Sequence, residues 1–301
     1  MEVRCIYQAR SALGEGALWS PKEQALYWVD QMRPEIHRFD PASGKDVQFE
    51  LDLPPQLGGL VPLKDGGFAL AAADGITLLS PEMKKRRTLV NPIEGRSTIS
   101  FNDAKNDRQG RLWAGTTDRL EVDAVGQLFR IDPDGTATVI ADSFVCSNGP
   151  SFSPDGRIMY HSCSHERVIN AYDIDPATGK ASNRRLFAKF EGDAGVPDGS
   201  TVDAEGYLWS THWGGARVTR FAPDGRTDRV IEIPVQKVTS CAFGGKNMET
   251  LFITTASIDF DNGRWIYMDE AGFDAAPMAG ALFAVDVGIK GLPEPLFDPR
   301  R

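Results

Sequence analysis

Short apolar segments alternate with turn sequences along the whole chain. In a representative unit, an apolar segment ends at Phe152, the turn Pro154-Asp155-Gly156 follows, and residues 157–161 have strand character. In such a turn Pro fixes φ, Asp accepts hydrogen bonds from its own backbone, and Gly adopts a positive φ. The unit therefore predicts a strand, a tight turn and a second strand, with Asn148 at the open end of the first strand.

The same unit recurs six times. Its marker residues are spaced 42, 44, 46, 50 and 43 residues apart, and they are Leu26, Phe68, Leu112, Ile158, Leu208 and Leu251. A period of about 40 to 50 residues with three or four short strands per unit is typical of a β-propeller blade. The pattern predicts an all-β fold in which residues 1–301 form a single domain, a six-bladed β-propeller with a central channel.

Two further segments flank the repeats. Residues 3–7 precede the first predicted inner strand, and residues 281–286 follow the sixth unit. One of these segments would complete the blade that the other begins, which closes the ring and removes an exposed sheet edge. Helix signals are nearly absent, apart from one predicted helical turn at residues 82–85.

The composition is that of an ordinary globular protein, with 41% hydrophobic and 25% charged residues. The net charge of −9 argues against a nucleic-acid partner, because a polyanion requires a basic surface. No apolar stretch approaches the ~20 residues of a membrane span, and the N-terminus lacks the apolar core of a signal peptide. Cys5, Cys146, Cys163 and Cys241 show no CxxC spacing, so free thiols are expected. We therefore expect a cytoplasmic protein, monomeric or weakly homo-oligomeric, that binds neither nucleic acid nor membranes.

Four polar residues stand at the heads of predicted inner strands, namely Glu15, Asn102, Asn148 and Asp198. The inner strands of a propeller all begin at the same mouth of the channel, so these residues are expected to converge. Two carboxylates and two amides form an all-oxygen environment that suits a hard divalent cation. Without a cation the two carboxylates would repel each other, and the pKa of one would rise. The alternative is that the Asn-Gly and Asp-Gly pairs serve only as turns, but no turn requires the glutamate.

His212 is the only histidine next to a Trp-Gly-Gly element, which occupies residues 213–215. A substrate-binding role and a packing role for this side chain both remain open. His161 and His165 are expected to be ordinary blade residues, and His37 is expected to lie at the surface.

Four motifs around the candidate positions resemble the signatures of the SMP-30/gluconolactonase (regucalcin-like) family. They are Gly14-Glu15-Gly16, Phe101-Asn102-Asp103, Ser147-Asn148-Gly149 and Pro197-Asp198-Gly199, and the resemblance extends over almost the whole chain. The resemblance implies one divalent cation (Ca, Mg, Mn, Zn or Fe) held by Glu15, Asn148 and Asp198. It also implies hydrolysis of a sugar aldonolactone, with Asn102 in contact with the substrate or with a metal-bound water.

One position departs from that family's pattern. Members often carry an Arg two residues before the first Asn, where this chain has Ser100. Ser100 is kept as a candidate substrate-binding residue, and Arg96 and Arg119 are candidates to replace the missing guanidinium. The short side chain favours a pentonolactone over a hexonolactone. Glu121 is a further candidate for binding substrate hydroxyls, with a solvated loop acid as the alternative.

The reaction inferred from these residues is the attack of water on a lactone carbonyl. A cation would act as the Lewis acid, and Asp198 would serve both as a ligand and as the catalytic base. No G-x-S-x-G elbow occurs, so no serine triad is expected. Two alternatives remain open. The first is an esterase or phosphotriesterase-like hydrolase at the same cation site, which the aromatic residues Trp19, Phe101 and Trp213 would favour; the second is a non-enzymatic calcium-binding propeller.

Overall fold

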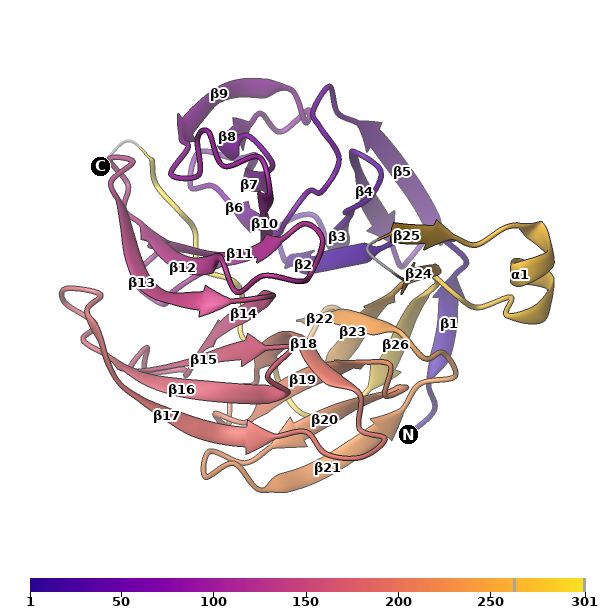
Figure 1. Cartoon of the computed structure of the whole chain (residues 1–301). Coiled ribbons are helices and arrows are strands. Elements are labelled where there is room, and N and C mark those ends of the chain that lie inside the picture. Colours follow the sequence, from indigo (N-terminus) through magenta and orange to yellow (C-terminus); the bar gives the residue numbers. More distant parts are fainter. Residues whose placement is uncertain (262–263, 300–301) are drawn as a thin grey trace.

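The fold is a ring of six four-stranded antiparallel sheets around a central axis (Figure 1). The computed structural model describes residues 1–261 and 264–299, and almost every regular element in this part of the chain is a β-strand. Because consecutive strands pair within each blade, short turns suffice to connect them. The predicted six-bladed all-β propeller is confirmed.

Each of the first five blades is a run of four consecutive strands, with the first strand innermost. The first blade consists of β2 (Gly14–Ser20), β3 (Ala25–Asp30), β4 (Glu35–Asp40) and β5 (Lys45–Glu50). The second consists of β6 (Leu60–Pro62), β7 (Phe68–Ala72), β8 (Gly75–Leu79) and β9 (Lys85–Val90). The third consists of β10 (Ile99–Asn106), β11 (Leu112–Asp118), β12 (Gly126–Ile131) and β13 (Ala137–Phe144). The fourth consists of β14 (Ser147–Phe152), β15 (Ile158–Cys163), β16 (Val168–Ile174) and β17 (Ala181–Lys189). The fifth consists of β18 (Val196–Val202), β19 (Leu208–Trp213), β20 (Arg217–Phe221) and β21 (Thr227–Glu232).

The sixth blade is built from both ends of the chain. Its inner strands are β22 (Val238–Gly244) and β23 (Thr250–Thr255), followed by β26 (Leu282–Asp286) and, outermost, β1 (Arg4–Tyr7). β1 pairs antiparallel with β26. This pairing is the predicted closure, and it joins the N-terminal segment to the last blade.

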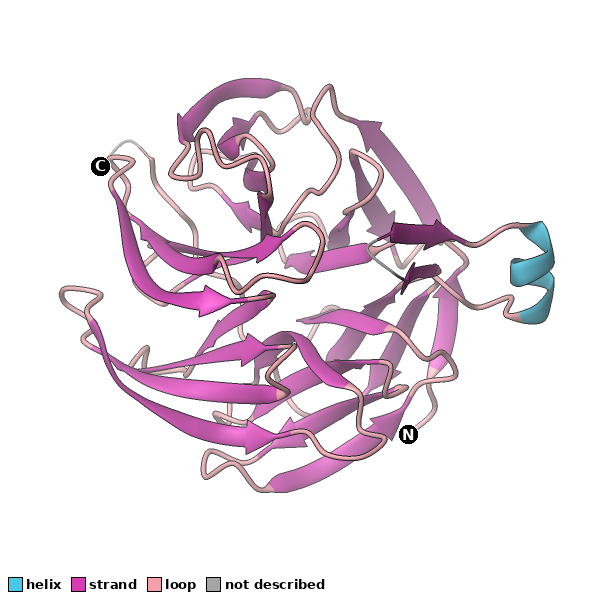
Figure 2. Cartoon of the chain, viewed as in Figure 1, coloured by secondary structure: helices cyan, strands magenta, loops and turns pink. Residues whose placement is uncertain are grey.

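An insertion separates β23 from β26. It contains a two-stranded hairpin, β24 (Ile258–Asp261) and β25 (Arg264–Tyr267), and then α1 (Glu270–Ala275). Within the described part of the chain α1 is the only helix, and Figure 2 shows it projecting from the rim of the ring. The side chain of Asp269 caps this helix by accepting a hydrogen bond from Gly272 N (2.8 Å). A helix of six residues is too short to produce a recognisable periodic pattern in the sequence.

Apolar side chains pack between neighbouring blades and form the core. Trp28, Trp113 and Trp209 are among the largest fully buried side chains. Two of them donate the indole N–H to an aspartate six residues earlier, Trp113 to Asp107 (3.0 Å) and Trp209 to Asp203 (2.8 Å). The same aspartates accept backbone hydrogen bonds from the following turn. Each aspartate therefore fastens a turn to the core of its blade.

The turn chemistry read from the sequence is confirmed in the fourth blade. Asp155 Oδ1 accepts a hydrogen bond from Arg157 N (3.1 Å), and Gly156 has a φ of +69°. Two smaller predictions are wrong. Residues 80–84 form a turn rather than a helix, and His37 is buried, with Nδ1 2.7 Å from Asp46 Oδ2.

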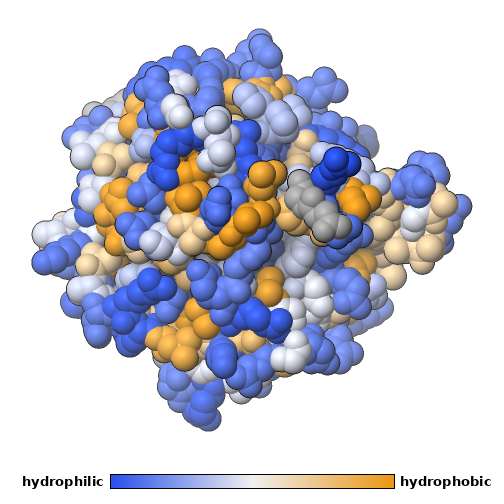
Figure 3. Space-filling view, viewed as in Figure 1, coloured by the Kyte–Doolittle hydropathy of each residue, from blue (hydrophilic) through white to orange (hydrophobic). Residues whose placement is uncertain are grey.

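The face turned toward the viewer in Figure 3 is mainly hydrophilic, with hydrophobic residues in smaller patches. No helix among residues 1–261 and 264–299 has the length and apolar character needed to cross a bilayer.

Candidate functional site

The four candidate residues all lie at β-bulges in innermost strands. The strand register shifts directly after Glu15 in β2 and directly after Asn148 in β14. It also shifts across Asn102 in β10 and across Asp198 in β18. A bulge adds unpaired residues and increases the local twist, which re-aims neighbouring side chains. The bulges thus let these side chains turn from the blades into the channel.

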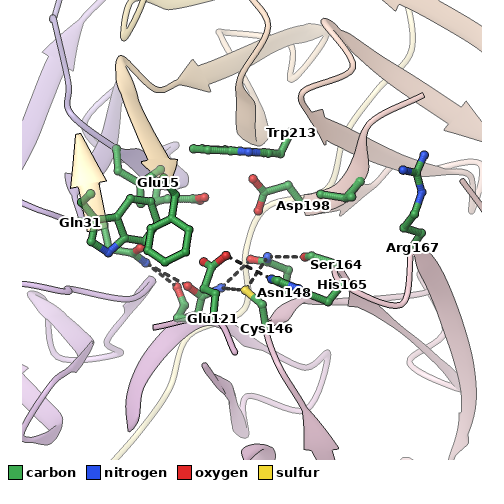
Figure 4. Close-up of a pocket in the computed structure, with 15 residues that line it drawn as sticks. Glu15, Gln31, Glu121, Cys146, Asn148, Ser164, His165, Arg167, Asp198 and Trp213 are labelled. Atoms are coloured by element: carbon green, nitrogen blue, oxygen red, sulfur yellow. Dashed lines mark hydrogen bonds and ion pairs between the residues drawn. The ribbon is translucent and has the colours of Figure 1, made fainter. Parts of the chain in front are cut away.

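All four residues line one pocket of about 350 Å³. Its walls are formed by Leu13, Glu15, Gln31, Asn102, Glu121, Cys146, Asn148, Ser164, His165, Arg167, Val196, Asp198, Trp213, Phe260 and Trp265 (Figure 4). The predicted convergence of residues from four different blades is therefore seen in the structure.

A chain of hydrogen bonds orients the amides of the pocket. Gln31 Nε2 donates to Asn102 Oδ1 (3.3 Å), and Asn102 Nδ2 donates to Asn148 Oδ1 (2.8 Å). Asn148 Nδ2 in turn donates to Ser164 Oγ (2.9 Å), which donates to the backbone oxygen of Pro197 (2.8 Å). These bonds fix which end of each amide is the oxygen. They also link the first, third, fourth and fifth blades around the mouth.

Glu15 and Asp198 are buried without a positively charged partner. Each is only 5% exposed, and within residues 1–261 and 264–299 neither forms an ion pair with a basic side chain. Burial raises the pKa of Glu15, and repulsion from Asp198 and then Asp103 adds to the rise. Burial likewise raises the pKa of Asp198, with further repulsion from Asp103 and Glu121. A bound positive charge would offset the repulsion between these two buried acids.

The chemistry of the donor set fits a hard divalent cation. Glu15 and Asp198 offer carboxylate oxygens, and Asn148 offers an amide oxygen. Both are ligand types that Ca²⁺ and Mg²⁺ prefer. Among the described residues, no cluster of three or more His, Cys, Asp or Glu side chains is arranged to hold a metal. The candidate set accordingly depends on an amide as its third protein ligand.

Glu121 and His165 form a pair at the rim of the pocket. Glu121 follows β11, and its Oε2 lies 3.1 Å from Nε2 of His165, which follows β15. The hydrogen bond with Glu121 raises the pKa of His165. Glu121 is thus brought to the pocket as expected for a hydroxyl-binding residue. His165 also lines the pocket, although the sequence indicated an ordinary blade residue.

The structure does not bring Ser100 or His212 to the pocket. Ser100 is completely buried within β10. His212 packs against the Phe190 ring at a centroid distance of 4.5 Å, and its Nδ1 lies 2.7 Å from the backbone oxygen of Ala194. Burial lowers the pKa of His212 to about 4. The packing interpretation of His212 fits this environment, and the bulge at Asn102 separates Ser100 from the face that Asn102 presents.

Neither arginine considered as a replacement for the missing guanidinium lines the pocket. Arg96 donates to Gln127 Oε1 and to the backbone oxygen of Val125 (3.0 Å). Arg119 Nε donates to the backbone oxygen of Ile99 (3.3 Å). Arg167 does line the pocket, and nothing in the sequence marks it, because an arginine in a turn belongs to no motif.

One wall of the pocket is apolar. It consists of Leu13, Val196, Trp213, Phe260 and Trp265, the last two from the inserted hairpin. Trp19 and Phe101, which we expected at the mouth, are core residues instead: Trp19 stacks on Phe252 at a centroid distance of 5.3 Å, and Phe101 packs against Phe129. The pocket is therefore lined by both polar and aromatic side chains.

A serine–histidine pair is present but inaccessible. Ser147 Oγ lies 2.7 Å from His161 Nε2, and both residues are completely buried. His161 packs against the Phe144 ring, and burial lowers its pKa to about 3. Because no substrate reaches this pair, His161 is an ordinary blade residue, as predicted.

Comparison with known proteins identifies the family. Residues 13–257 match the profile of the family described as "SMP-30/Gluconolactonase/LRE-like region". The chain is 36% identical over 298 residues to a 6-deoxy-6-sulfogluconolactonase of Pseudomonas putida, covering 98% of both chains. It is 36% identical over 295 residues to a pentonolactonase of Haloferax volcanii, covering 98% of this chain and 97% of that one. A solved structure described as the calcium-binding protein regucalcin from Agrobacterium tumefaciens superposes with a TM-score of 0.90 at 26% identity, covering 98% of this chain and 97% of that one. The chain therefore belongs to the SMP-30/gluconolactonase/LRE-like family.

Proposed function

We propose that this protein hydrolyses a sugar aldonolactone, of the pentonolactone or gluconolactone type, to the aldonic acid. Its relatives include lactonases, which are hydrolases of lactone ester bonds, and this chain is an enzyme of the same class. The observation that carries the proposal is the pair of buried acids, Glu15 and Asp198, beside the amide of Asn148 in a pocket of about 350 Å³. That volume is sufficient for a monosaccharide lactone.

Glu15, Asn148 and Asp198 would hold one divalent cation, whose identity among Ca²⁺, Mg²⁺, Mn²⁺, Zn²⁺ and Fe²⁺ is open. Such a cation, when bound, would polarise the lactone carbonyl and lower the pKa of a coordinated water. Asn102 supports this set because its Nδ2 donates to Asn148 Oδ1 and so keeps the amide oriented.

Asp198 is the residue that we assign to proton transfer. As water attacks the carbonyl carbon, Asp198 takes the proton of the water, and it returns this proton to the ring oxygen when the C–O bond of the lactone breaks. Asn102 cannot act as a base near neutral pH, so its role is to hydrogen-bond the substrate and to position Asn148.

The remaining walls would hold the sugar. Glu121, in its pair with His165, presents a carboxylate for substrate hydroxyls. Trp213, Phe260 and Trp265 offer apolar surface for the C–H face of the ring and keep bulk water from it.

The proposal is tested with purified Asp198→Asn and Asn102→Ala. Hydrolysis of a panel of aldonolactones is followed as proton release above the uncatalysed rate, with and without EDTA, and the metal content of each variant is measured. Asp198→Asn should lower kcat/KM by about 10³-fold or more and weaken metal retention. Asn102→Ala should keep most of the metal and lower kcat/KM by about 10- to 100-fold. Near wild-type turnover in Asp198→Asn together with metal loss in Asn102→Ala would show that the two roles are assigned the wrong way round.

The apolar wall favours a second candidate, an esterase or phosphotriesterase-like activity at the same site. An aryl ester and an aryl phosphotriester belong in the same panel for this reason. Cation binding without turnover of any of these substrates would instead indicate a calcium-binding propeller, the third alternative.

A further inference from the structure

Among the described residues that line the pocket, Arg167 is the only one with a guanidinium. Its Nε donates to the backbone oxygen of Phe190 (3.0 Å), and its Nη2 donates to the backbone oxygen of Gly192 (2.9 Å). Within residues 1–261 and 264–299 no acidic side chain forms an ion pair with it. The two carbonyls fix the guanidinium in place, and its charge is left without an anionic partner.

The turn that carries Arg167 does not need an arginine. Arg167 directly precedes β16 and has a φ of +57°, and Ala216 directly precedes β20 in the next blade with a φ of +52°. The carbonyl of Arg167 accepts from Phe190 N (2.9 Å), just as the carbonyl of Ala216 accepts from Ile233 N (2.8 Å). Since the fifth blade forms this backbone arrangement with alanine, the turn itself does not depend on the arginine side chain.

The charges of the pocket also leave Arg167 unbalanced. Three acids line it, but a divalent cation at Glu15 and Asp198 would neutralise two of them, and His165 pairs with the third, Glu121. Figure 4 shows Arg167 at the edge of the pocket, on the far side of Asp198 from Glu15. A half-buried guanidinium with free N–H groups is suited to an oxyanion, which it binds through short, charge-assisted hydrogen bonds.

We propose that Arg167 determines specificity for a lactone that carries a negatively charged oxyanion group on its exocyclic carbon, remote from the carbonyl under attack. The group is a sulfonate, a phosphate or a carboxylate, which share the oxygen chemistry that a guanidinium recognises. This inference rests on the proposed lactonase function and names the substrate class within it.

The kinetic test compares matched lactones. Glucono-1,5-lactone is the neutral substrate. The anionic substrates are its 6-phosphate, its 6-deoxy-6-sulfonate and the corresponding lactone with a C6 carboxylate. Comparing these three also shows which oxyanion the protein prefers. The wild type should prefer at least one anionic lactone. Arg167→Met should lower kcat/KM for that lactone by about 10- to 100-fold, mainly through KM, and change the neutral one by less than about threefold. Arg167→Lys should restore part of the loss, because it keeps the charge without the planar fork.

The matched control is Arg217→Met. Arg217 Nε also donates to a backbone carbonyl, that of Gly215 (2.8 Å), but its guanidinium lies near Asp193 (3.8 Å) and does not line the pocket. This control should leave the ratio of anionic to neutral turnover unchanged. Equal losses for neutral and anionic lactones in Arg167→Met, or a wild type that prefers the neutral lactone, would overturn the inference.

A second readout does not depend on turnover. Isothermal titration calorimetry measures the binding of four aldonates to the wild type and to Arg167→Met. The aldonates are 6-phosphogluconate, 6-deoxy-6-sulfogluconate, glucarate and gluconate, and every titration is done once with Ca²⁺ and once with EDTA. The wild type should bind an anionic product about tenfold or more tightly than gluconate, and Arg167→Met should lose this preference. If no lactone is hydrolysed, but the wild type prefers anionic products and Arg167→Met does not, the proposed function fails and the anion site stands. If a neutral lactone is hydrolysed and no preference is found, the anion site fails and the proposed function stands.

Discussion

The cation site makes a sharp prediction about thermal stability in the variant Asp198→Asn. Glu15 and Asp198 are both 5% exposed, and neither has a basic partner in the part of the chain that the structure describes. At neutral pH the cation-free wild type therefore carries repulsion and desolvation that destabilise the fold, as the raised pKa of each group indicates. Replacing Asp198 by the isosteric amide removes this repulsion. The cation-free variant should be at least as stable as the cation-free wild type, and it should gain far less from added cation.

The expected shift follows from the size of the chain. A cation present at 100 times its Kd stabilises the folded state by about 2.7 kcal/mol. The unfolding entropy is about 2.1 cal/mol/K per residue, or roughly 0.6 kcal/mol/K for 301 residues, so Tm should rise by about 4 °C in the wild type. If the loss of one carboxylate weakens binding 100-fold, the same concentration only equals Kd, and about 0.4 kcal/mol, less than 1 °C, remains.

Differential scanning calorimetry on EDTA-dialysed protein, titrated with Ca²⁺, Mg²⁺, Mn²⁺ or Zn²⁺, measures these shifts. The control is Asp193→Asn, which makes the same chemical change at a side chain that is 97% exposed. This control should keep the full wild-type shift. A rise of about 4 °C in Asp198→Asn would refute the cation site, and so would a loss of the shift in the control.

Three further predictions concern the core, the channel and the substrate. Asp203→Ala removes the acceptor of the hydrogen bonds from Arg220 Nε (2.9 Å) and Trp209 Nε1 (2.8 Å) in a buried network. The free energy of unfolding, measured in urea, should therefore fall by about 3–5 kcal/mol. A fall of less than about 1 kcal/mol would contradict the role given to this aspartate. Burial raises the pKa of Asp103 from 3.8 to about 6, so its contribution to stability is present below about pH 4 and is lost as the pH rises through 6. Asp103→Asn should flatten the fall in unfolding free energy between about pH 4 and pH 6, and an unchanged slope would show that Asp103 does not titrate there. Among neutral lactones, we expect a modest kcat/KM preference for a pentonolactone over gluconolactone, and a clear preference for gluconolactone would overturn this expectation.

The repeat made much of the site predictable. Glu15, Asn102, Asn148 and Asp198 stand at equivalent places in four of the repeated units. Because a propeller closes into a ring, equivalent places lie around one axis, and the chemistry of the mouth follows from the residue types alone. The turn residues of each hairpin were readable for the same local reason, as Asp155 shows.

The alternation of side-chain direction along a strand does not continue through the bulges. Ser100 stands two residues before Asn102 and would share its face in a regular strand, but the register shift between Phe101 and Asp103 breaks the alternation. Ser100 is consequently buried while Asn102 lines the pocket. His212 likewise faces Phe190 rather than the channel.

The sequence by itself determined the number of blades, the closure of the ring and the four polar residues at its mouth, because each follows from a repeat and from local turn chemistry. Only the tertiary structure decided what completes the pocket. Arg167, His165 and the inserted hairpin with Trp265 belong to connections between strands, where no periodicity dictates the direction of a side chain. Their positions depend on contacts between segments that are distant in the sequence. Arg167 is held by the carbonyl of Phe190, at the end of the same blade, and His165 is held by the carboxylate of Glu121, from the neighbouring blade. Such contacts form only when the tertiary structure brings these segments together.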